Sequence, residues 1–115
     1  MPSIEQLDDQ LNNMTAAGQI LDALERFYAE DCTFQEGNQE PRNGRATQHA
    51  HLSRFFDTLK QFNGATLHSR GVGDTVTLSE WTFDMVGPDG PIVWHEILRR
   101  RWADGKVVSE RYYTA

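Results

Sequence analysis

Two Asp-Gly pairs, at residues 89–90 and 104–105, divide the second half of the chain into segments in which apolar and polar residues alternate. Asp-Gly between such segments is a strong β-hairpin signal, because these residues readily adopt the positive φ of a two-residue turn. The second half is therefore predicted to fold as an antiparallel meander. Its first segment is long enough to hold two strands that meet near residues 71–74. The predicted strand segments cover residues 66–86, 91–102 and 106–113.

The first half of the chain has the periodicity of helices. Apolar residues recur there every three or four positions, which places them on one helix face. Ser3 and Gln6 form the pattern of a capping box at the start of the first helix. The pair Asn63-Gly64 is typical of a helix C-terminus. The predicted helices cover residues 3–14, about 20–30 and 45–62.

A short strand, Cys32 to Glu36, and a loop, Asn38 to Gly44, separate the second helix from the third. The order of elements is then two helices, a strand, a helix and a meander, which is an α+β arrangement. We expect the helices to pack on one face of a strongly curved, mainly antiparallel sheet, with a cone-shaped pocket between the two layers. The length predicts a single domain, 1–115.

The strand predicted within residues 74–86 changes its apolar face near Ser79-Glu80. Leu78 lies on one side of an ideal strand, whereas Trp81 and Phe83 lie on the other. A β-bulge at this point would explain the change. The alternative is that helices cover one half of the strand and a partner subunit covers the other half.

Composition excludes several classes of function. A net charge of −6 and a pI near 5.1 disfavour binding to nucleic acid or to an anionic membrane. Cys32 is the only cysteine, so neither an internal disulfide nor a cysteine-rich metal site is possible. His49 and His51 would lie on different helix faces, so we expect no metal and no cofactor. No segment has the length of a membrane span, and a soluble, cytoplasmic protein is expected.

Two stretches resemble a known superfamily. They are FYAEDCTFQEGNQEPRNGRA, from Phe27 to Ala46, and DGKVVSERYY, from Asp104 to Tyr113. Together with the order of elements, they resemble the cone-shaped fold of nuclear transport factor two, scytalone dehydratase, ketosteroid isomerase and the SnoaL-like polyketide cyclases. The resemblance implies this cystatin-like fold over nearly the whole chain. It also implies a homodimer that forms through the exposed face of the sheet.

The resemblance assigns one candidate catalytic residue, Glu36. Ketosteroid isomerases carry an aspartate as general base at the end of the first strand, and Glu36 is the matching position here. The sequence departs from that enzyme in three ways: the residue is Glu, the loop after it is one residue shorter, and residues 3–15 contain no Tyr to stabilise an oxyanion.

Alternation along the strand 91–102 places Glu96 and Arg100 on one face and His95 on the other. Glu96 and Arg100 would lie roughly 13 Å apart, too far to pair with each other. Arg100 therefore needs a partner from a neighbouring strand, and the candidates are Glu80 and Glu110. A buried charge requires such a partner or a ligand. The predicted pocket residues are Tyr28, Phe34, Phe56, Trp81, Trp94, Glu96, Arg100 and Tyr113.

Two functions follow from these observations, and the sequence leaves both open. The chain could be a metal-independent enzyme of the isomerase, cyclase or dehydratase type, using Glu36 as general base on a small apolar or carbonyl-containing molecule. Alternatively, it could be a non-catalytic ligand-binding domain or a dimeric structural module with the same fold.

Overall fold

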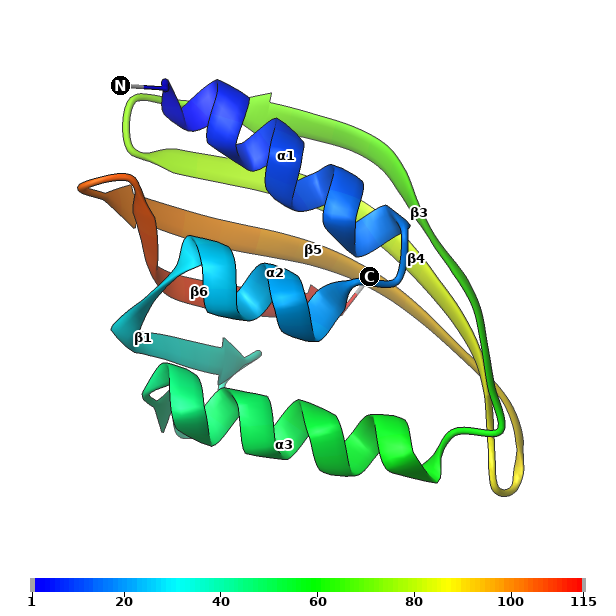
Figure 1. Cartoon of the computed structure of the whole chain (residues 1–115). Coiled ribbons are helices and arrows are strands. Elements are labelled where there is room, and N and C mark those ends of the chain that lie inside the picture. The colour runs from blue at the N-terminus through cyan, green and yellow to red at the C-terminus, as the bar shows by residue number, and fades with distance from the viewer. Residues whose placement is uncertain (1, 115) are drawn as a thin grey trace.

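The computed structural model describes residues 2–114 and contains three helices and six strands in that range (Figure 1). The helices are α1 (Ile4–Ala16), α2 (Ile20–Phe27) and α3 (Arg45–Thr58). The strands are β1 (Tyr28–Glu36), β2 (Arg42–Asn43), β3 (Gln61–Val72), β4 (Val76–Gly87), β5 (Gly90–Ala103) and β6 (Lys106–Thr114).

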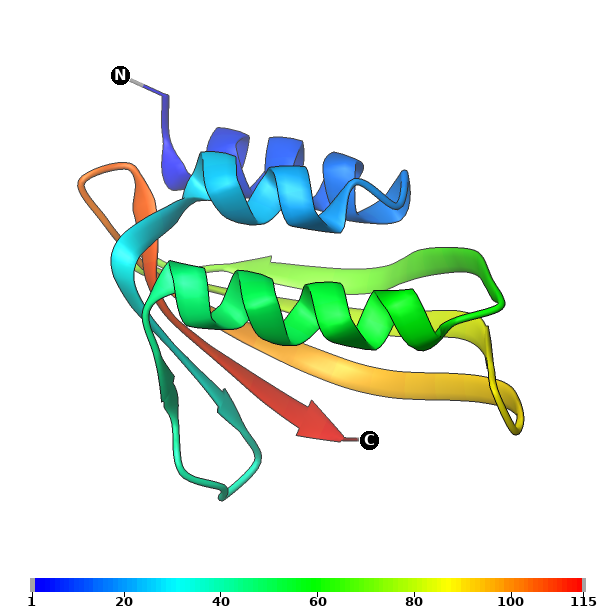
Figure 2. The same ribbon diagram turned by 60° about the horizontal axis from the view of Figure 1, so that its bottom comes forward.

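All six strands form one sheet, in the order β2-β1-β6-β5-β4-β3. Strand β1 pairs with β6 in parallel, and the other neighbours are antiparallel. The long strands β3, β4 and β5 bend along their length, and the three helices lie on one face of the sheet (Figures 1 and 2). The other face has no helix over it (Figure 2). The structure thus confirms the predicted α+β fold, with helices packed on a curved, mainly antiparallel sheet.

The capping box predicted for α1 is present. The Ser3 hydroxyl accepts a hydrogen bond from the Gln6 backbone N–H at 3.2 Å, and the Gln6 side chain accepts one from the Ser3 N–H at 3.0 Å. These contacts satisfy two of the N–H groups that a helix start leaves without partners. Both predicted hairpins form, between β4 and β5 and between β5 and β6. Asp104-Gly105 is the turn of the second hairpin, with φ of 53° and 76°, whereas the turn of the first is Pro88-Asp89 and Gly90 already pairs with Gly87.

The prediction for the end of α3 was wrong. The helix ends at Thr58, and β3 already begins at Gln61. Gly64 does not terminate a helix but lies in β3, with φ at 153°, where the pairing with β4 shifts between Phe62 and Gly64. The positive φ that makes glycine common after helices also suits a bulge, so the local signal was ambiguous.

The bulge predicted at Ser79-Glu80 was also wrong. Strands β4 and β5 pair without interruption, and the register shifts in the sheet lie in β1, in β3 and near Trp102. The buried face of β4 continues through Thr77 and Ser79, which are polar but almost inaccessible. Their hydroxyl groups take part in buried hydrogen bonds, so the inner face is continuous although its apolar character is not.

Two hydrophobic clusters fill the space between the helices and the sheet. One gathers Leu11 and Leu24 from α1 and α2 with residues of β1 and β6, and the other gathers Trp81 and Leu98 from the strands β4 and β5. Tyr112 packs against both clusters. Among residues 2–114, no helix has both the length and the apolar character needed to cross a membrane.

Candidate ligand-binding and acid-base site

A cavity of about 110 Å³ lies between the helices and the inner face of the sheet. Its lining is mainly apolar, and it includes charged groups at a few positions. Such a composition, with few polar groups in an apolar hollow, is typical of small-molecule sites. The apolar lining consists of Leu11, Ile20, Ala23, Leu24, Tyr28, Phe34, Leu52, Phe55, Phe56, Phe62, Phe83, Met85, Trp94, Leu98 and Tyr112, and the polar lining of Thr15, Glu36, Gln48, Glu96, Arg100 and Glu110.

Aromatic rings form much of the wall. Phe55 of α3 stacks on Trp94 of β5, with ring centroids 4.9 Å apart, so helix and sheet meet at this side of the cavity. Tyr28 and Phe34, both on β1, stack with centroids 5.6 Å apart. Stacked rings add direction to the packing and keep the wall rigid, which favours flat or compact apolar ligands.

Glu36 is the last residue of β1 and lines this cavity, with 44% of its side chain exposed. Strand β2 pairs with β1 and brings Arg42 beside it, so that Arg42 Nη2 lies 3.2 Å from Glu36 Oε1. His51 of α3 approaches the same oxygen, and its Nε2 lies 3.9 Å from Glu36 Oε1. Partial burial, followed by the charge of Arg42, lowers the pKa of His51, which favours its neutral form at neutral pH. Arg42 is thus the cation that holds Glu36.

Glu96 faces the same cavity from β5, and its neighbour His95 lies on the outer face, where it contacts Thr82. Burial raises the pKa of Glu96 to about 7, and the negative charges of Glu36 and Glu110 add to this effect. Within residues 2–114, no hydrogen bond reaches the Glu96 carboxyl group. Glu96 therefore exchanges a proton near neutral pH and has free hydrogen-bonding capacity.

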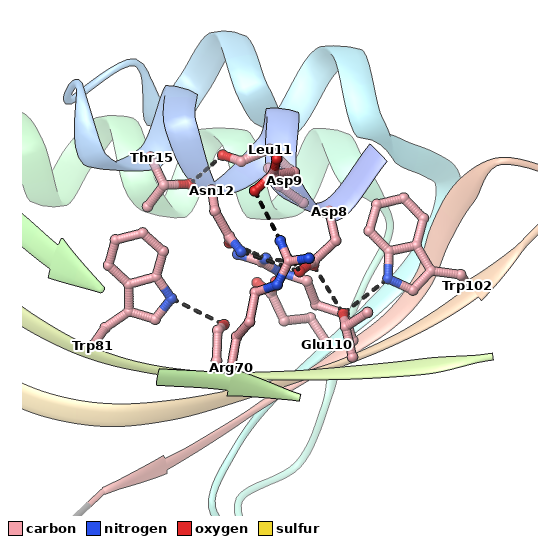
Figure 3. A network of polar contacts seen from close by, with 12 residues as sticks. Asp8, Asp9, Leu11, Asn12, Thr15, Arg70, Trp81, Trp102 and Glu110 are labelled. Carbon is pink, nitrogen blue, oxygen red and sulfur yellow. Dashed lines mark hydrogen bonds and ion pairs between the residues drawn. The ribbon is translucent and has the colours of Figure 1, made fainter. Parts of the chain in front are cut away.

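A buried ion network lies between α1 and the sheet (Figure 3). Arg100 is 1% exposed and donates through Nε to Glu110 at 2.9 Å and through Nη1 to Asp8 at 3.0 Å and Asn12 at 2.6 Å. Thr77 donates to the same Asp8 oxygen at 2.9 Å. The predicted partner Glu110 is thus present, and Asp8 of α1 is a second one that sequence alone did not suggest.

Two tyrosine hydroxyl groups complete the shell around Glu110. Tyr112 donates to Oε1 at 2.6 Å, and Tyr28 donates to Oε2, the oxygen that Arg100 also contacts. Burial, and then the charge of Glu110, raises the pKa of both tyrosines well above the ordinary value. Both therefore stay protonated and act as hydrogen-bond donors. The same two causes raise the pKa of the Cys32 thiol, which disfavours a nucleophilic thiolate.

The structure brings most of the predicted pocket residues together. Trp81 is completely buried beside Phe83 in the core and does not line the cavity. Tyr113 is 37% exposed, and it does not line the cavity either, because β6 directs its neighbour Tyr112 inward. The predicted residues that do line it are Tyr28, Phe34, Glu36, Phe56, Trp94, Glu96 and Arg100.

Among the residues that sequence reasoning did not predict are three that make hydrogen bonds near Glu36 and Glu110, namely Gln48, Tyr112 and Arg42. Gln48 lies four positions before Leu52 on the apolar stripe of α3, so its helical spacing could have revealed that it faces inward. Arg42 and Tyr112 left no such signal, because their places depend on the pairing of β1 with β2 and β6. No group of three or more potential metal-ligating side chains occurs in the part of the chain that the structure describes.

Comparisons with known proteins identify the family. The model of the SnoaL-like domain matches residues 9–110, most of the chain. No functionally curated protein matches the sequence.

Solved structures share the fold at low sequence identity. A Mesorhizobium loti protein provisionally described as a SnoaL-like polyketide cyclase is 16% identical, with a TM-score of 0.84 over 97% of this chain and 99% of its own. A Xanthomonas campestris protein with a cystatin-like fold is 13% identical, with a TM-score of 0.84 over 99% and 92%. A Catenulispora acidiphila protein with a ketosteroid isomerase-like fold, solved in complex with trimethylamine, is 15% identical, with a TM-score of 0.75 over 91% and 85%. The match to the family model shows that this chain belongs to the SnoaL-like domain family, and the structural likenesses show that it has the ketosteroid isomerase-like, cystatin-like fold of these proteins.

Proposed function

We propose that the chain binds a small, mostly apolar, carbonyl-containing molecule in the cavity and catalyses metal-independent proton transfer on it. Reactions of this kind underlie isomerisation, cyclisation and dehydration. The observation that carries the proposal is a pair of carboxyl groups, Glu36 and Glu96, on the wall of one apolar cavity in different environments. Two titratable groups with different environments are the usual basis for dividing acid and base roles.

The two carboxyl groups would have complementary roles. Glu36, held by Arg42, accepts a proton from the carbon next to the ligand carbonyl. The electron pair of the broken C–H bond moves to the carbonyl oxygen, where negative charge develops. Glu96 in its protonated form donates a hydrogen bond or the proton to that oxygen, and an enol results. As Glu36 returns its proton to a different carbon of a conjugated ligand, the carbonyl re-forms, any proton on the oxygen goes back to Glu96, and an isomerisation is complete.

One relative supports the size and character of this ligand. The Catenulispora acidiphila protein of the same fold was solved with trimethylamine, which is small and largely apolar. The cavity of this chain, at about 110 Å³ with aromatic walls, suits a compact molecule of that kind. Ligand screening should therefore begin with small cyclic and branched ketones.

The test is the exchange of α-hydrogens for deuterium in a bound ketone, followed by NMR. Glu36→Gln should slow this exchange by about 100-fold or more, because a general base typically contributes 10²–10⁴-fold. Glu30→Gln is the matched control, since Glu30 is an exposed acid on the same strand. Exchange that persists unchanged in Glu36→Gln would refute the role of the base.

A second candidate function is a non-catalytic binding domain or structural module that forms a homodimer through the sheet. In residues 2–114, no helix covers the outer face of the sheet (Figure 2). This face carries exposed apolar side chains. We call Leu78, Val93, Ile97 and Tyr113 the outer-face patch; they are between 37% and 50% exposed. Ligand binding without any α-hydrogen exchange in the wild type would favour this candidate over the enzyme.

A further inference from the structure

Gln48 is buried, with 1% of its surface exposed, although its side chain is polar. It lies in the first turns of α3, where its backbone N–H donates to Gly44 at 3.1 Å. Its side-chain amide joins two groups: the oxygen accepts from Arg42 Nε at 2.8 Å, and the nitrogen donates to the Tyr112 hydroxyl at 3.1 Å. A buried amide with both ends satisfied indicates a specific role, since burial without partners costs free energy.

The orientation of this amide is fixed by the ion network behind it. Glu110 is paired with Arg100, so its carboxylate only accepts hydrogen bonds. Tyr112 must therefore give its proton to Glu110, at 2.6 Å, and its oxygen is left as an acceptor. That acceptor requires the nitrogen of Gln48, which turns the amide oxygen toward Arg42.

The reversed amide would fail at both ends. Its nitrogen would face the guanidinium of Arg42, which has donors only. Its oxygen would face a Tyr112 hydroxyl whose proton already belongs to Glu110. Each end would bury a polar group without a partner, which costs free energy. One arrangement is therefore strongly preferred.

The fixed amide in turn places the base. A guanidinium group is a rigid, planar fork, so an anchor on Nε also fixes the direction of Nη2. In Arg42 that second nitrogen contacts Glu36 Oε1 at 3.2 Å. A directed chain of hydrogen bonds thus runs from the buried pair of Arg100 and Glu110 to the carboxylate at the cavity wall.

We propose that Gln48 is a positioning residue, which orients Arg42 and through it the base Glu36. The proposal rests on the function proposed above for Glu36. Neither the amide nor the guanidinium releases a proton readily, so the chain of contacts orients the base and does not conduct protons. Gly44, with a φ of 97°, is the N-cap of α3, the helix that carries Gln48. The contacts from Gln48 through Arg42 end at the single carboxylate of Glu36.

The test follows the Nε–H signal of Arg42 by ¹⁵N NMR in the ligand-free protein. In the wild type this proton is hydrogen-bonded and should exchange slowly with water. Gln48→Met should accelerate its exchange at least tenfold. Gln48→Glu keeps an acceptor for Arg42 but loses the donor to Tyr112, so its exchange should be intermediate between the wild type and Gln48→Met. Tyr112→Phe should accelerate exchange by a smaller factor, although the Tyr112 hydroxyl makes no hydrogen bond to Arg42. The exposed Gln39→Met is the control and should change nothing.

The kinetic consequence separates positioning from simple stability. Gln48→Met should lower kcat for α-hydrogen exchange about tenfold with KM unchanged, and Gln48→Glu, which restores only the acceptor for Arg42, should recover part of it. Wild-type values for the Arg42 signal in both Gln48→Met and Tyr112→Phe would overturn the inference. Because that signal is read without ligand, a failure of Glu36 as base would appear separately, as unchanged exchange in Glu36→Gln.

Discussion

Arg100 shows how a charged residue can be accommodated in the core of a small domain. Its guanidinium is 1% exposed and is matched by two carboxylates and an amide oxygen, from Glu110, Asp8 and Asn12. The network is nearly self-contained, so the cost of removing each charge from water is offset by close, directed contacts. Such a network is stable as a whole and is sensitive to the loss of any member.

Arg100→Met should therefore destabilise the protein by about 3–5 kcal/mol, because it leaves Glu110 buried without its cation and Asp8 with only Arg70, whose Nη1 lies 3.9 Å from Asp8 Oδ2. Urea unfolding monitored by circular dichroism measures the change. Arg101→Met is a matched control, since Arg101 is the next residue on β5 and is exposed on the opposite face. Equal losses in the two variants would contradict the structural role given to Arg100.

Glu96 should give the protein a distinctive pH dependence. Its pKa is about 7 in the folded protein against an ordinary value of 4.5, so the unfolded chain ionises first as the pH rises. The contribution of Glu96 to stability is therefore complete below about pH 4.5 and is lost as the pH rises through 7. The full shift corresponds to about 3 kcal/mol, which water at the cavity reduces to about 1–2 kcal/mol.

Glu96→Gln, which cannot ionise, should gain that stability relative to the wild type between pH 4.5 and 7. The measurement is the difference in unfolding free energy between the two proteins at several pH values, since other titrating groups cancel in it. A constant difference over this range would show that Glu96 titrates normally.

At the scale of elements, β3 illustrates why glycine signals depend on context. Asn63 and Gly64 stand where a helix end was expected, yet they form a bulge against β4. The Asn63 side chain donates to Asp84 at 3.1 Å across the strands, which ties the extra residue to the sheet. The bulge helps the long strand to bend, as the curved sheet requires.

Gly64→Ala should destabilise the protein by about 1–2 kcal/mol, because a Cβ is strained at a φ of 153° although no neighbour would touch it. Gly71→Ala tests the same substitution in the same strand, where the space is also open and φ is not in the glycine region. It should be neutral or slightly stabilising, since alanine restricts the unfolded chain. Thermal unfolding distinguishes the two, and similar melting temperatures would mean that Gly64 is not strained.

At the scale of the whole molecule, the two faces of the sheet differ in what covers them. The inner face is covered by helices and encloses the cavity, whereas the outer face presents the outer-face patch without helix cover (Figures 1 and 2). Exposed apolar residues on a sheet are a common basis for association between copies. This arrangement leaves the cavity on the far side from the proposed dimer contact.

The homodimer can be tested by Ile97→Lys, which places a charge in the centre of the outer-face patch beside Glu80 on β4. The wild type should sediment as a dimer at micromolar concentration, and the variant as a folded monomer. Val72→Lys is the control, because Val72 is similarly exposed but pairs with Thr77, whose side chain faces inward. A monomeric wild type would rule out this contact.

The sequence by itself determined the class of fold and which residues of a strand share one face. Alternation along β5 put Glu96 and His95 on opposite faces, and the structure decided that Glu96 is the one that faces the cavity. The Asp-Gly pairs correctly predicted the hairpins. These properties are local, because they depend on turn geometry and on the period of a single strand. The candidate base Glu36, by contrast, came from the resemblance to ketosteroid isomerases, which carry their base at the end of the first strand.

Only the tertiary structure decided which of these groups meet. Asp8 of α1 reaches Arg100 across 92 positions of sequence, and Gln48 of α3 reaches Tyr112 across 64. Such contacts depend on how the helices pack on the sheet and on the register of the strands. Local sequence patterns contain no information about either. The same reason explains why the polar residues Thr77 and Ser79 made the apolar pattern of β4 look interrupted by a bulge. Their burial depends on hydrogen bonds of their hydroxyl groups, which the strand pattern does not reveal.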